Sequence, residues 1–381
     1  MKTNADRRQI RIAVIIRNFS SYGGGAERYC VELTKKLSKI YEVHIFSQEN
    51  TERLPEVFFH KVPKWINKPR FLNLLLFSYM TNKSTNNKFD IIHSHDRVSH
   101  ANIYTFHVPC FKSKWTSANT MKKISLWFGA LLSPRELTYL WLEKKVMSSV
   151  AQKSFISVSE YLSLNILQNY PKLEGNITIA YPGSEIKNDM ATFTDYRTKL
   201  KIPKNAFILV FVAHGFKRKG LPAVIKALEL LENSHIYLIV VGRGDATKIK
   251  ISSSLVKKNI FYIGSVDDIN SVYKSANALV HPTLGDTYGM VIVEAMSNNL
   301  PVIVSSSKYC GFSEHLSNKE ALLIENPRDA QEIKTLIKKI YKNPDLRKSL
   351  SKNALRIVKQ INWEESLKQT VKAYENYLKK N

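Results

Sequence analysis

A chain of 381 residues, 44% of them hydrophobic, is long enough to form two domains that each bury a core. The formal net charge of +25 is larger than expected if the lysines were only solvated surface residues, and it implies an anionic partner. Composition leaves this partner open among nucleic acid, an anionic membrane surface and a phosphorylated substrate. Residues 1–10 lack the apolar segment of a signal peptide, and no run approaches the roughly 18 apolar residues of a membrane span, so a cytoplasmic location is expected.

The first half of the chain alternates apolar runs of strand length with segments of helical period. This alternation is typical of parallel sheets with crossover helices. The first strand is followed by three glycines and then by apolar residues at helical spacing, which predicts a helix from about residue 26 to 37. A longer helix is expected over about residues 134–152. The expected strands cover residues 11–19, 41–47, 89–95, 101–107, 153–159 and 176–182.

A second series of the same kind follows, with helices expected within residues 221–231 and 289–299. Its expected strands cover residues 207–214, 235–242, 259–264, 277–283, 301–307 and 321–326. The fold class is therefore α/β, with two doubly wound units. Ligand loops at the carboxyl ends of the strands of two such units predict a nucleotide-binding cleft between them.

The polar stretch over residues 184–204 contains no strand-like run, and the hinge between the two units is placed there. The last segment, residues 362–380, is predicted to be an amphipathic helix without a partner in its own sequence neighbourhood. Its expected apolar stripe consists of Trp363, Leu367, Val371, Tyr374 and Leu378.

Two carboxylates mark the most informative segment, HPTLGDTYGMVIVEAM. Glu294 is the one charge in an otherwise apolar helix that begins near Gly289, and Asp286 lies at the mouth of the preceding loop. A charge in a buried helix must be paired or hydrogen-bonded, and a helix amino terminus is a ready site for a diphosphate. The alternative is structural: Asp286 caps the helix and Glu294 meets a buried Lys or Arg.

The D-x7-E run, followed by LPVIVS, resembles the E-x7-E signature of the retaining family 4 glycosyltransferases. The resemblance implies that Asp286 contacts the hydroxyls of a donor sugar and that Glu294 binds the ribose of its nucleotide. Asp stands where the family has Glu, and this shorter side chain leaves the identity of the donor sugar open. Further donor-binding residues that the resemblance implies here are Thr287, Tyr288, Gly289, Met290 and Val291.

Two cations, Arg218 and Lys219, follow the strand 207–214 in the run HGFKRKGL. Cations at this position neutralise the charge that builds on a diphosphate leaving group. Exposed basic loop residues are common, but this pair resembles the Arg/Lys pair of the same family. The resemblance also implies nucleotide-binding positions in this loop and in the runs GRGD and NIFYIGSVDD, for which ordinary turns are the alternative. These positions are Gly215, Gly242, Tyr262 and Val266.

The run SYGGGAERY, after the first strand, resembles the glycine-rich loop that lies near donor phosphates and acceptor in this family, and it implies roles for Gly24 and Gly25. A glycine-rich turn alone is more often only a turn. His107 matches the family's His or Asp that faces the transferred sugar. His93, His95 and Asp96, at the end of the neighbouring strand, are secondary candidates.

No metal or cofactor is expected. The chain contains no Asp-x-Asp run, which disfavours a mechanism based on a divalent metal. Cys30, Cys110 and Cys310 have neither metal-ligand nor redox spacing and are expected to be reduced thiols in or near the core.

The resemblance spans the chain and implies the GT-B fold, in which two Rossmann-like domains face a central cleft. It assigns acceptor binding to residues 1–184, nucleotide-sugar binding to residues 185–362, and a helix that returns to the first domain to residues 363–381. The motif order FKRKG, HPTLGDTYGM, KYCGFSEHL is most similar to glycosyltransferases of the lipopolysaccharide core.

The implied reaction is a retaining, metal-independent transfer of a hexose or N-acetylhexosamine from a UDP-sugar to a lipid-linked saccharide. One alternative is transfer from another nucleotide sugar to a capsule, O-antigen or other surface glycan. A nucleotide-binding or nucleic-acid-binding protein without transferase activity is the alternative from a different class. No helix-turn-helix, zinc or RNA-recognition signature is visible, so a nucleic-acid partner is not expected.

Residues 111–145 mix aromatic and basic side chains, as segments that lie on an anionic bilayer do. This pattern predicts peripheral binding to the inner face of the cell membrane. The alternative is a helical subdomain whose aromatic residues pack on the first sheet. The residues concerned are Lys112, Lys114, Trp115, Lys122, Lys123, Trp127, Phe128, Leu131 and Leu132.

Overall fold

The computed structural model describes residues 10–21, 23–116, 133–184 and 193–380. The chain forms two compact units, one of Met1–Pro182 with Trp363–Asn381 and one of Gly183–Asn362. The two segments that connect them meet in the second unit. There Ser184 N donates to Ile361 O at 3.1 Å, and Ser184 forms an isolated bridge with Asn362.

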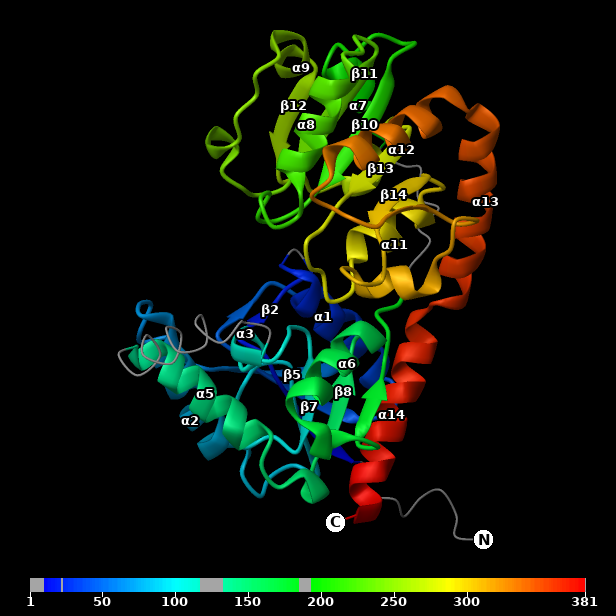
Figure 1. Cartoon of the computed structure of the whole chain (residues 1–381). Coiled ribbons are helices and arrows are strands. Elements are labelled where there is room, and N and C mark those ends of the chain that lie inside the picture. The colour runs from blue at the N-terminus through cyan, green and yellow to red at the C-terminus, as the bar shows by residue number, and fades with distance from the viewer. Residues whose placement is uncertain (1–9, 22, 117–132, 185–192, 381) are drawn as a thin grey trace, which may run out of the picture. The chain divides into compact units, whose positions relative to one another are not determined.

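The first unit is built on a seven-stranded sheet with the order β5-β3-β1-β6-β7-β8-β9, and all neighbouring strands are parallel (Figure 1). Its strands are β1 (Arg11–Ile15), β3 (Glu42–Ser47), β5 (Val57–Lys61), β6 (Ile91–Ser94), β7 (Ile103–Phe106), β8 (Ser154–Ser157) and β9 (Ile177–Ile179). Its helices are α1 (Gly25–Leu37), α2 (Arg70–Thr85), α3 (Ser113–Thr116), α5 (Pro134–Val146), α6 (Glu160–Asn169) and α14 (Trp363–Lys380), with 3-10 turns η1 (Val150–Gln152) and η2 (Pro171–Leu173).

The second unit has a six-stranded parallel sheet with the order β12-β11-β10-β13-β14-β15. Its strands are β10 (Phe207–Val212), β11 (Ile236–Val241), β12 (Ile260–Gly264), β13 (Ala278–His281), β14 (Val302–Ser305) and β15 (Leu322–Ile324). Its helices are α7 (Tyr196–Lys199), α8 (Leu221–Leu231), α9 (Ser254–Lys258), α10 (Ile269–Ser275), α11 (Met290–Ser297), α12 (Ala330–Lys342) and α13 (Pro344–Gln360), with 3-10 turns η3 (Ala246–Lys248) and η4 (Gly311–His315).

Both sheets have the strand order of a doubly wound fold, which confirms the predicted α/β class. In such a sheet the order reverses at one point, here between β1 and β6 in the first unit and between β10 and β13 in the second. Ligands bind beyond the carboxyl ends of the strands at this point, because no helix covers the crevice there. The topology therefore places the loops after β1, β6, β10 and β13 at the two candidate binding edges.

The carboxyl-terminal helix α14 packs in the first unit against α1 and β8, which confirms that it returns to the first domain (Figure 1). Its buried face differs from the predicted stripe. Trp363 and Tyr374 are buried as expected, but Leu378 is exposed. The rest of the buried face consists of small or polar residues, Ser366, Thr370 and Ala373. Small side chains allow α14 to lie close to α1, whereas apolar periodicity alone predicts the larger residues as the contact.

Two predicted elements end earlier than expected. The strand predicted over residues 11–19 ends at Ile15, and Asn18–Phe19 instead pairs with Glu49–Asn50 in a separate two-stranded sheet, β2 with β4. The helix predicted over residues 134–152 ends at Val146, because Ser149 adopts a left-handed backbone conformation with φ of 53° and leads into η1. Among the described residues, no helix is long and apolar enough to cross a membrane.

Candidate active site

The loops after β10 and β13 are bonded to each other at the carboxyl edge of the second sheet. Leu284 N donates to Arg218 O at 3.0 Å, and Arg218 Nη1 donates to Gly285 O at 2.7 Å. Gly220 has φ of 86°, and a Cβ atom there would lie 2.0 Å from Pro282 O. Only glycine fits this contact, which brings the two motifs together although they are 67 residues apart.

Lys219, Asp286 and His281 form a buried polar cluster at this edge. Lys219 Nζ makes an ion pair with Asp286 Oδ2, and His281 Nε2 lies 3.2 Å from the same oxygen. Lys219 is 8% exposed and His281 is 1% exposed, whereas the side chain of Asp286 is 19% exposed. Asp286 Oδ1 has no partner among the described residues, so this oxygen is available to accept a hydrogen bond from a ligand.

The charge states of this cluster follow from its contacts. Burial alone would raise the pKa of Asp286, but the hydrogen bond from His281 and the positive charge of Lys219 outweigh burial and hold this pKa well below its usual value. Burial lowers the pKa of His281 more than Asp286 raises it. His281 is therefore neutral at neutral pH. Because an ionised carboxylate only accepts, the ring proton lies on Nε2 and is donated to Asp286.

Sequence reasoning missed His281. Its signal was its position as the last residue of a buried strand, five residues before Asp286. Its other ring nitrogen, Nδ1, is buried and has no hydrogen-bond partner among the described residues. The desolvation of Nδ1 costs free energy, and the hydrogen bond that Nε2 makes to a charged group offsets that cost.

Helix α11 begins next to this cluster. Its amino-terminal cap is Gly289, with φ of 102°, and no side chain caps the helix. Asp286 therefore does not cap α11, contrary to the structural alternative, and the amide groups of the first turn face no capping oxygen. Glu294 Oε2 accepts a hydrogen bond from Tyr273 Oη at 3.1 Å. The other predicted donor residues of this run line the start of α11: Thr287, Met290 and Val291 are half-buried and Tyr288 is 3% exposed.

The loop that carries Asp286 is fixed by the run KYCGFSEHL. Asp286 N donates to Tyr309 O at 2.8 Å, and Gly311 N donates to Asp286 O at 3.0 Å. A Cβ atom on Gly289 would lie 2.8 Å from Cys310 Sγ, so glycine is needed there for space as well as for its φ. These backbone hydrogen bonds thus fix the main chain from which the carboxylate of Asp286 projects.

The predicted glycines of the second unit meet in the turns after β10 and β11. Gly215 N donates to Arg243 O at 2.8 Å, and Gly242 N donates to Gly264 O at 2.7 Å. Gly242 has φ of 111°, and a Cβ atom there would lie 2.0 Å from Ala213 O. Tyr262 is 39% exposed, with its ring 6.3 Å from that of Phe216, and Val266 is half-buried two residues beyond Gly264. The structure thus joins Gly215 and Gly242, while no described contact joins Tyr262 or Val266 to Asp286.

In the first unit the predicted glycine-rich loop precedes α1. Gly24 is the amino-terminal cap of α1 and Gly25 its first residue, and Gly24 has no capping side chain. A Cβ atom on Gly23 would lie 2.9 Å from Glu27 Cβ, and one on Gly24 would lie 2.9 Å from Glu27 Oε2. Of these contacts, the one at Gly23 is with the fixed Cβ of Glu27 and favours glycine, whereas the one at Gly24 is with the far end of the flexible Glu27 side chain, which can move away.

The histidines of β6 and β7 form a cluster. His107 Nε2 lies 2.9 Å from His95 Nδ1, and the ring nitrogens of His93 lie 2.8 Å from Tyr374 Oη and 2.7 Å from Thr105 Oγ1. Burial lowers the pKa of His107 to about 4 and that of His93 to about 3. Burial also places the pKa of His95 well below its usual value. All three histidines are therefore neutral hydrogen-bonding groups at neutral pH.

Asp96 has a structural contact. Its carboxylate accepts from Arg17 N at 2.7 Å and from Arg17 Nε at 3.1 Å. These bonds tie the segment after β1 to the segment after β6. Within the described residues, no group of three or more His, Cys, Asp or Glu side chains is arranged to hold a metal ion. The three cysteines are free and buried, as predicted.

The described part of the segment 111–145 is partly folded into the first unit. Trp115 is 5% exposed and packs with Phe111, while Lys114 pairs with Glu136 at 3.4 Å. Lys112 Nζ lies over the ring of Tyr170 at 5.2 Å. These three positions thus follow the alternative of a packed subdomain. The remaining predicted residues lie outside the described residues: Lys122, Lys123, Trp127, Phe128, Leu131 and Leu132.

Two family models match consecutive parts of the chain. The model described as Glycosyltransferase Family 4 matches residues 23–187, and the model described as Glycosyl transferases group 1 matches residues 192–356. An uncharacterised glycosyltransferase of Methanocaldococcus jannaschii is 26% identical over 365 residues, which cover 93% of this chain and 95% of that protein. The lipopolysaccharide glucosyltransferase WaaG of Escherichia coli is 27% identical over 165 residues, 42% of this chain and 44% of that protein.

Solved structures agree with the fold. The crystal structure of WaaG has a TM-score of 0.78 to this chain at 18% identity, and the match covers 94% of this chain and 98% of that one. The structure of Anabaena HepE in complex with UDP-glucose has a TM-score of 0.67 at 15% identity, covering 95% and 98%. At such identities the likeness concerns the fold alone, and it confirms the two predicted Rossmann-like domains.

Proposed function

This chain belongs to the family of glycosyltransferases that the group 1 and family 4 models describe, and we propose that it transfers a hexose or N-acetylhexosamine from a UDP-sugar to a lipid-linked saccharide such as the lipopolysaccharide core. The proposed transfer retains the anomeric configuration and needs no metal. WaaG, by its name, is a lipopolysaccharide glucosyltransferase, and the HepE structure contains UDP-glucose. Both support the proposed classes of acceptor and donor.

One observation carries the proposal: the carboxylate of Asp286 is held by two donors on Oδ2 while Oδ1 faces no described partner. A carboxylate fixed in this way accepts a hydrogen bond from a sugar hydroxyl without having to reorganise. Because its pKa is low, Asp286 stays ionised throughout the working pH range. We assign it to the hydroxyls of the donor sugar.

The diphosphate of the donor is assigned to the adjoining groups. The uncapped start of α11 presents backbone amides and the positive end of a helix dipole, which favour a phosphate. Arg218 is exposed, and its guanidinium is held over this edge by Gly285 O. As the glycosidic bond breaks, negative charge grows on the diphosphate, and Arg218, Lys219 and the amides of α11 stabilise it. The structure modifies the predicted role of Lys219, because its charge is shared with Asp286.

Glu294 and His107 complete the assignment. Glu294 lies in the second turn of α11, and its carboxylate accepts a hydrogen bond from Tyr273. We assign this carboxylate to the ribose hydroxyls. His107 is neutral, so it is assigned to hold a hydroxyl of the transferred sugar rather than to transfer a proton at neutral pH. These two roles come from the family resemblance, and the geometry of each unit is compatible with them.

The proposed acceptor implies work at the cytoplasmic face of the membrane. Helix α5 exposes Leu137 and Trp141, with exposed fractions of 44% and 48%, beside Lys144 and Lys145. Apolar and basic side chains on one exposed helix suit binding to an anionic surface. Since Trp115 is buried, we place the described part of the membrane contact on α5 instead.

A donor panel tests the proposal. The purified protein is incubated with UDP-, GDP- and ADP-sugars and lipopolysaccharide core acceptors, with and without EDTA, and the product is examined by NMR. We expect one UDP-sugar to be used, unaffected by EDTA, with an anomeric configuration identical to that of the donor. An inverted product contradicts retention, and a strict need for manganese or magnesium contradicts the assigned role of Arg218 and Lys219.

A further inference from the structure

A basic groove lies at the end of the second sheet that is opposite to the candidate active site. It has a volume of about 610 Å³, and α13 forms one wall. Residues 276–277 precede β13 and residues 299–301 precede β14, so the groove lies at the amino-terminal edge. Because all strands of this sheet are parallel, Lys219 and Asp286 lie at the other edge. The groove is therefore a separate feature of this unit.

Four exposed cations of α13 line the groove together with the half-buried Arg347: Lys348, Lys352, Arg356 and Lys359. Their spacing of four, four and three residues places them along one helix face, over about 16 Å. None of them has a hydrogen-bond or ion-pair partner among the described residues, and no Asp or Glu lines the groove. Arg347 differs, because its Nη1 donates to Ile340 O at 2.7 Å and its guanidinium covers Phe207.

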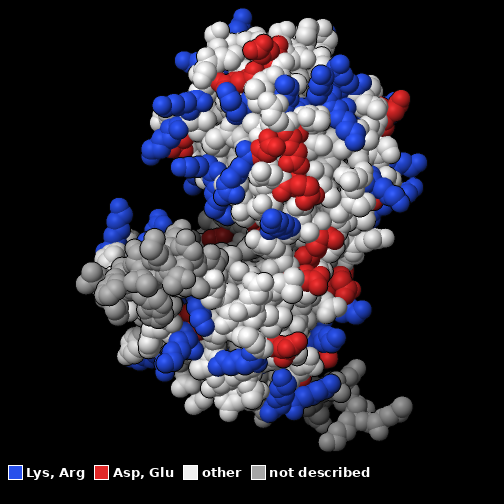
Figure 2. Space-filling model, in the orientation of Figure 1, with Lys and Arg blue, Asp and Glu red and all other residues white. Residues whose placement is uncertain are grey.

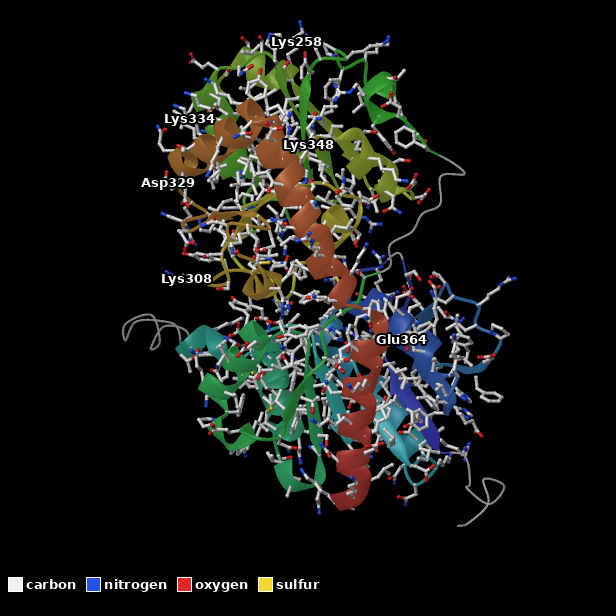
Figure 3. The ribbon with its side chains drawn as sticks, turned by 90° about the vertical axis from the view of Figure 1, so that its right-hand side faces the viewer. Lys258, Lys308, Asp329, Lys334, Lys348 and Glu364 are labelled. Carbon is white, nitrogen blue, oxygen red and sulfur yellow. The ribbon has the colours of Figure 1, made fainter. Side chains whose placement is uncertain are left out.

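Without a bound anion, the mutual repulsion of these cations destabilises α13. Like charges three and four residues apart on a helix repel each other and destabilise it by a few tenths of a kcal/mol per pair. Basic residues are otherwise spread over the drawn face of both units, as Figure 2 shows. Figure 3 is drawn from the side on which α13 is visible, and it labels Lys348 on that helix. What distinguishes α13 is that its aligned cations line a concave site.

The residues that line the groove limit the chemical class of ligand that fits it. Outside α13 the groove is lined by Ala276, Asn277, Asn299, Leu300 and Pro301, and no aromatic side chain lines it. Nucleobases and sugar rings are generally bound by stacking on aromatic rings, which are missing from this lining. A flat bilayer surface does not reach the floor of a concave site. A compact ligand whose charge is concentrated in phosphate groups matches both the cations and the volume.

We propose that this groove binds a soluble ligand that carries two or more phosphate groups, at a site distinct from the candidate active site. Inorganic tripolyphosphate serves as the probe, and lysine acylation followed by mass spectrometry locates it. Tripolyphosphate is expected to slow acylation of Lys348, Lys352 and Lys359 several-fold, while Lys257 and Lys258 on α9 stay reactive. Binding at the start of α11 would leave the α13 lysines unprotected, so the two sites are distinguished in the native protein.

Matched variants separate the groove from diffuse charge. Lys348→Gln/Lys352→Gln/Arg356→Gln is expected to weaken tripolyphosphate binding at least tenfold in low salt. The control Lys257→Gln/Lys258→Gln/Lys338→Gln removes the same charge from exposed positions of the same unit and should change affinity less than twofold. Thermal unfolding checks that both variants fold. The measurement needs no transferase activity, so it stands apart from the test of the proposed function.

Three outcomes would overturn the proposal. Equal weakening in the two triple variants would mean that net charge alone attracts the anion. If tripolyphosphate does not protect the α13 lysines from acylation, the proposal fails. If the protein then sediments with phosphatidylglycerol vesicles and the α13 triple variant does not, the partner is a lipid surface. Protection by a single-stranded oligonucleotide but not by tripolyphosphate would make it a nucleic acid.

Discussion

His281 donates its Nε2 proton to Asp286 Oδ2 across 3.2 Å, and Lys219 occupies the same oxygen from the neighbouring loop. The two donors come from the last residue of β13 and from the turn after β10. Each is almost fully buried, so neither is free to turn away. The free oxygen of Asp286 is consequently aimed by His281, which has no assigned contact with the donor, and by Lys219, which is also assigned to the diphosphate.

His281→Leu should lower kcat/KM about 10- to 100-fold, the effect of losing one hydrogen bond to a charged group. His281→Gln keeps a donor near the position of Nε2 and should recover most of this loss. Steady-state kinetics of the two variants, with unfolding curves, give the comparison. A role in packing alone would make the two variants equally impaired, and that result would rule out positioning of Asp286.

Asp286→Ala should abolish transfer, and it should also destabilise the second unit, because Lys219 is left buried without its partner. The double variant Asp286→Ala/Lys219→Met should regain stability but not activity. Calorimetry and product formation separate the two effects. Transfer by either variant at more than a trace would contradict the assignment of Asp286 to the donor sugar.

Glu294→Ala should abolish transfer with an unchanged melting temperature, since Glu294 is half-buried and its described hydrogen bond comes from the Tyr273 hydroxyl. The expected cause is lost contact with the nucleotide ribose. Isothermal titration calorimetry with the nucleoside diphosphate should show the loss of binding affinity directly. Unchanged nucleotide affinity would move the ribose site elsewhere.

Arg218→Ala should reduce kcat roughly 100- to 1,000-fold, the range for removing one electrostatic contact to a developing charge. Lys217→Ala, at the exposed neighbouring position, is the matched control and should retain activity. EDTA should change the kcat of neither variant. If the control loses as much as Arg218→Ala, the effect belongs to the loop and not to the guanidinium.

The first unit should lose stability on mild acidification. His93 and His107 have folded-state pKa values of about 3 and about 4, below the ordinary value of 6.5, because burial disfavours their charged forms. Above pH 6.5 the two histidines are neutral in both the folded and the unfolded chain, so the free energy of unfolding does not change with pH on their account. Below it the unfolded chain takes up protons that the folded chain cannot, so stability falls towards pH 4. The melting temperature of His93→Gln should fall less between pH 7 and 5 than that of the wild type, whereas exposed His235→Gln should follow the wild type. Coinciding curves for all three proteins would refute this origin.

The sequence by itself determined the fold class and the edge of each sheet at which the candidate site residues lie. Buried parallel strands are continuous apolar runs, so residues 207–214 and 277–283 were recognisable without any tertiary information. The residues that end such strands necessarily gather at one edge. This geometry, together with the family resemblance of their motifs, is why Arg218, Lys219 and Asp286 could be grouped from the sequence.

Tertiary structure decided what depends on contacts between distant segments. His281 was indistinguishable from the end of any buried strand until Asp286 was seen to fold back onto it. Trp115 was compatible with a membrane or a core until Phe111 was placed against it. On α14, close packing selected Ser366 and Thr370 over Leu378, because the space left by α1 and β8, and not the hydrophobicity of the helix, determines which face is buried. A sequence pattern records which side chains avoid water, but which partner covers them is a property of the folded chain.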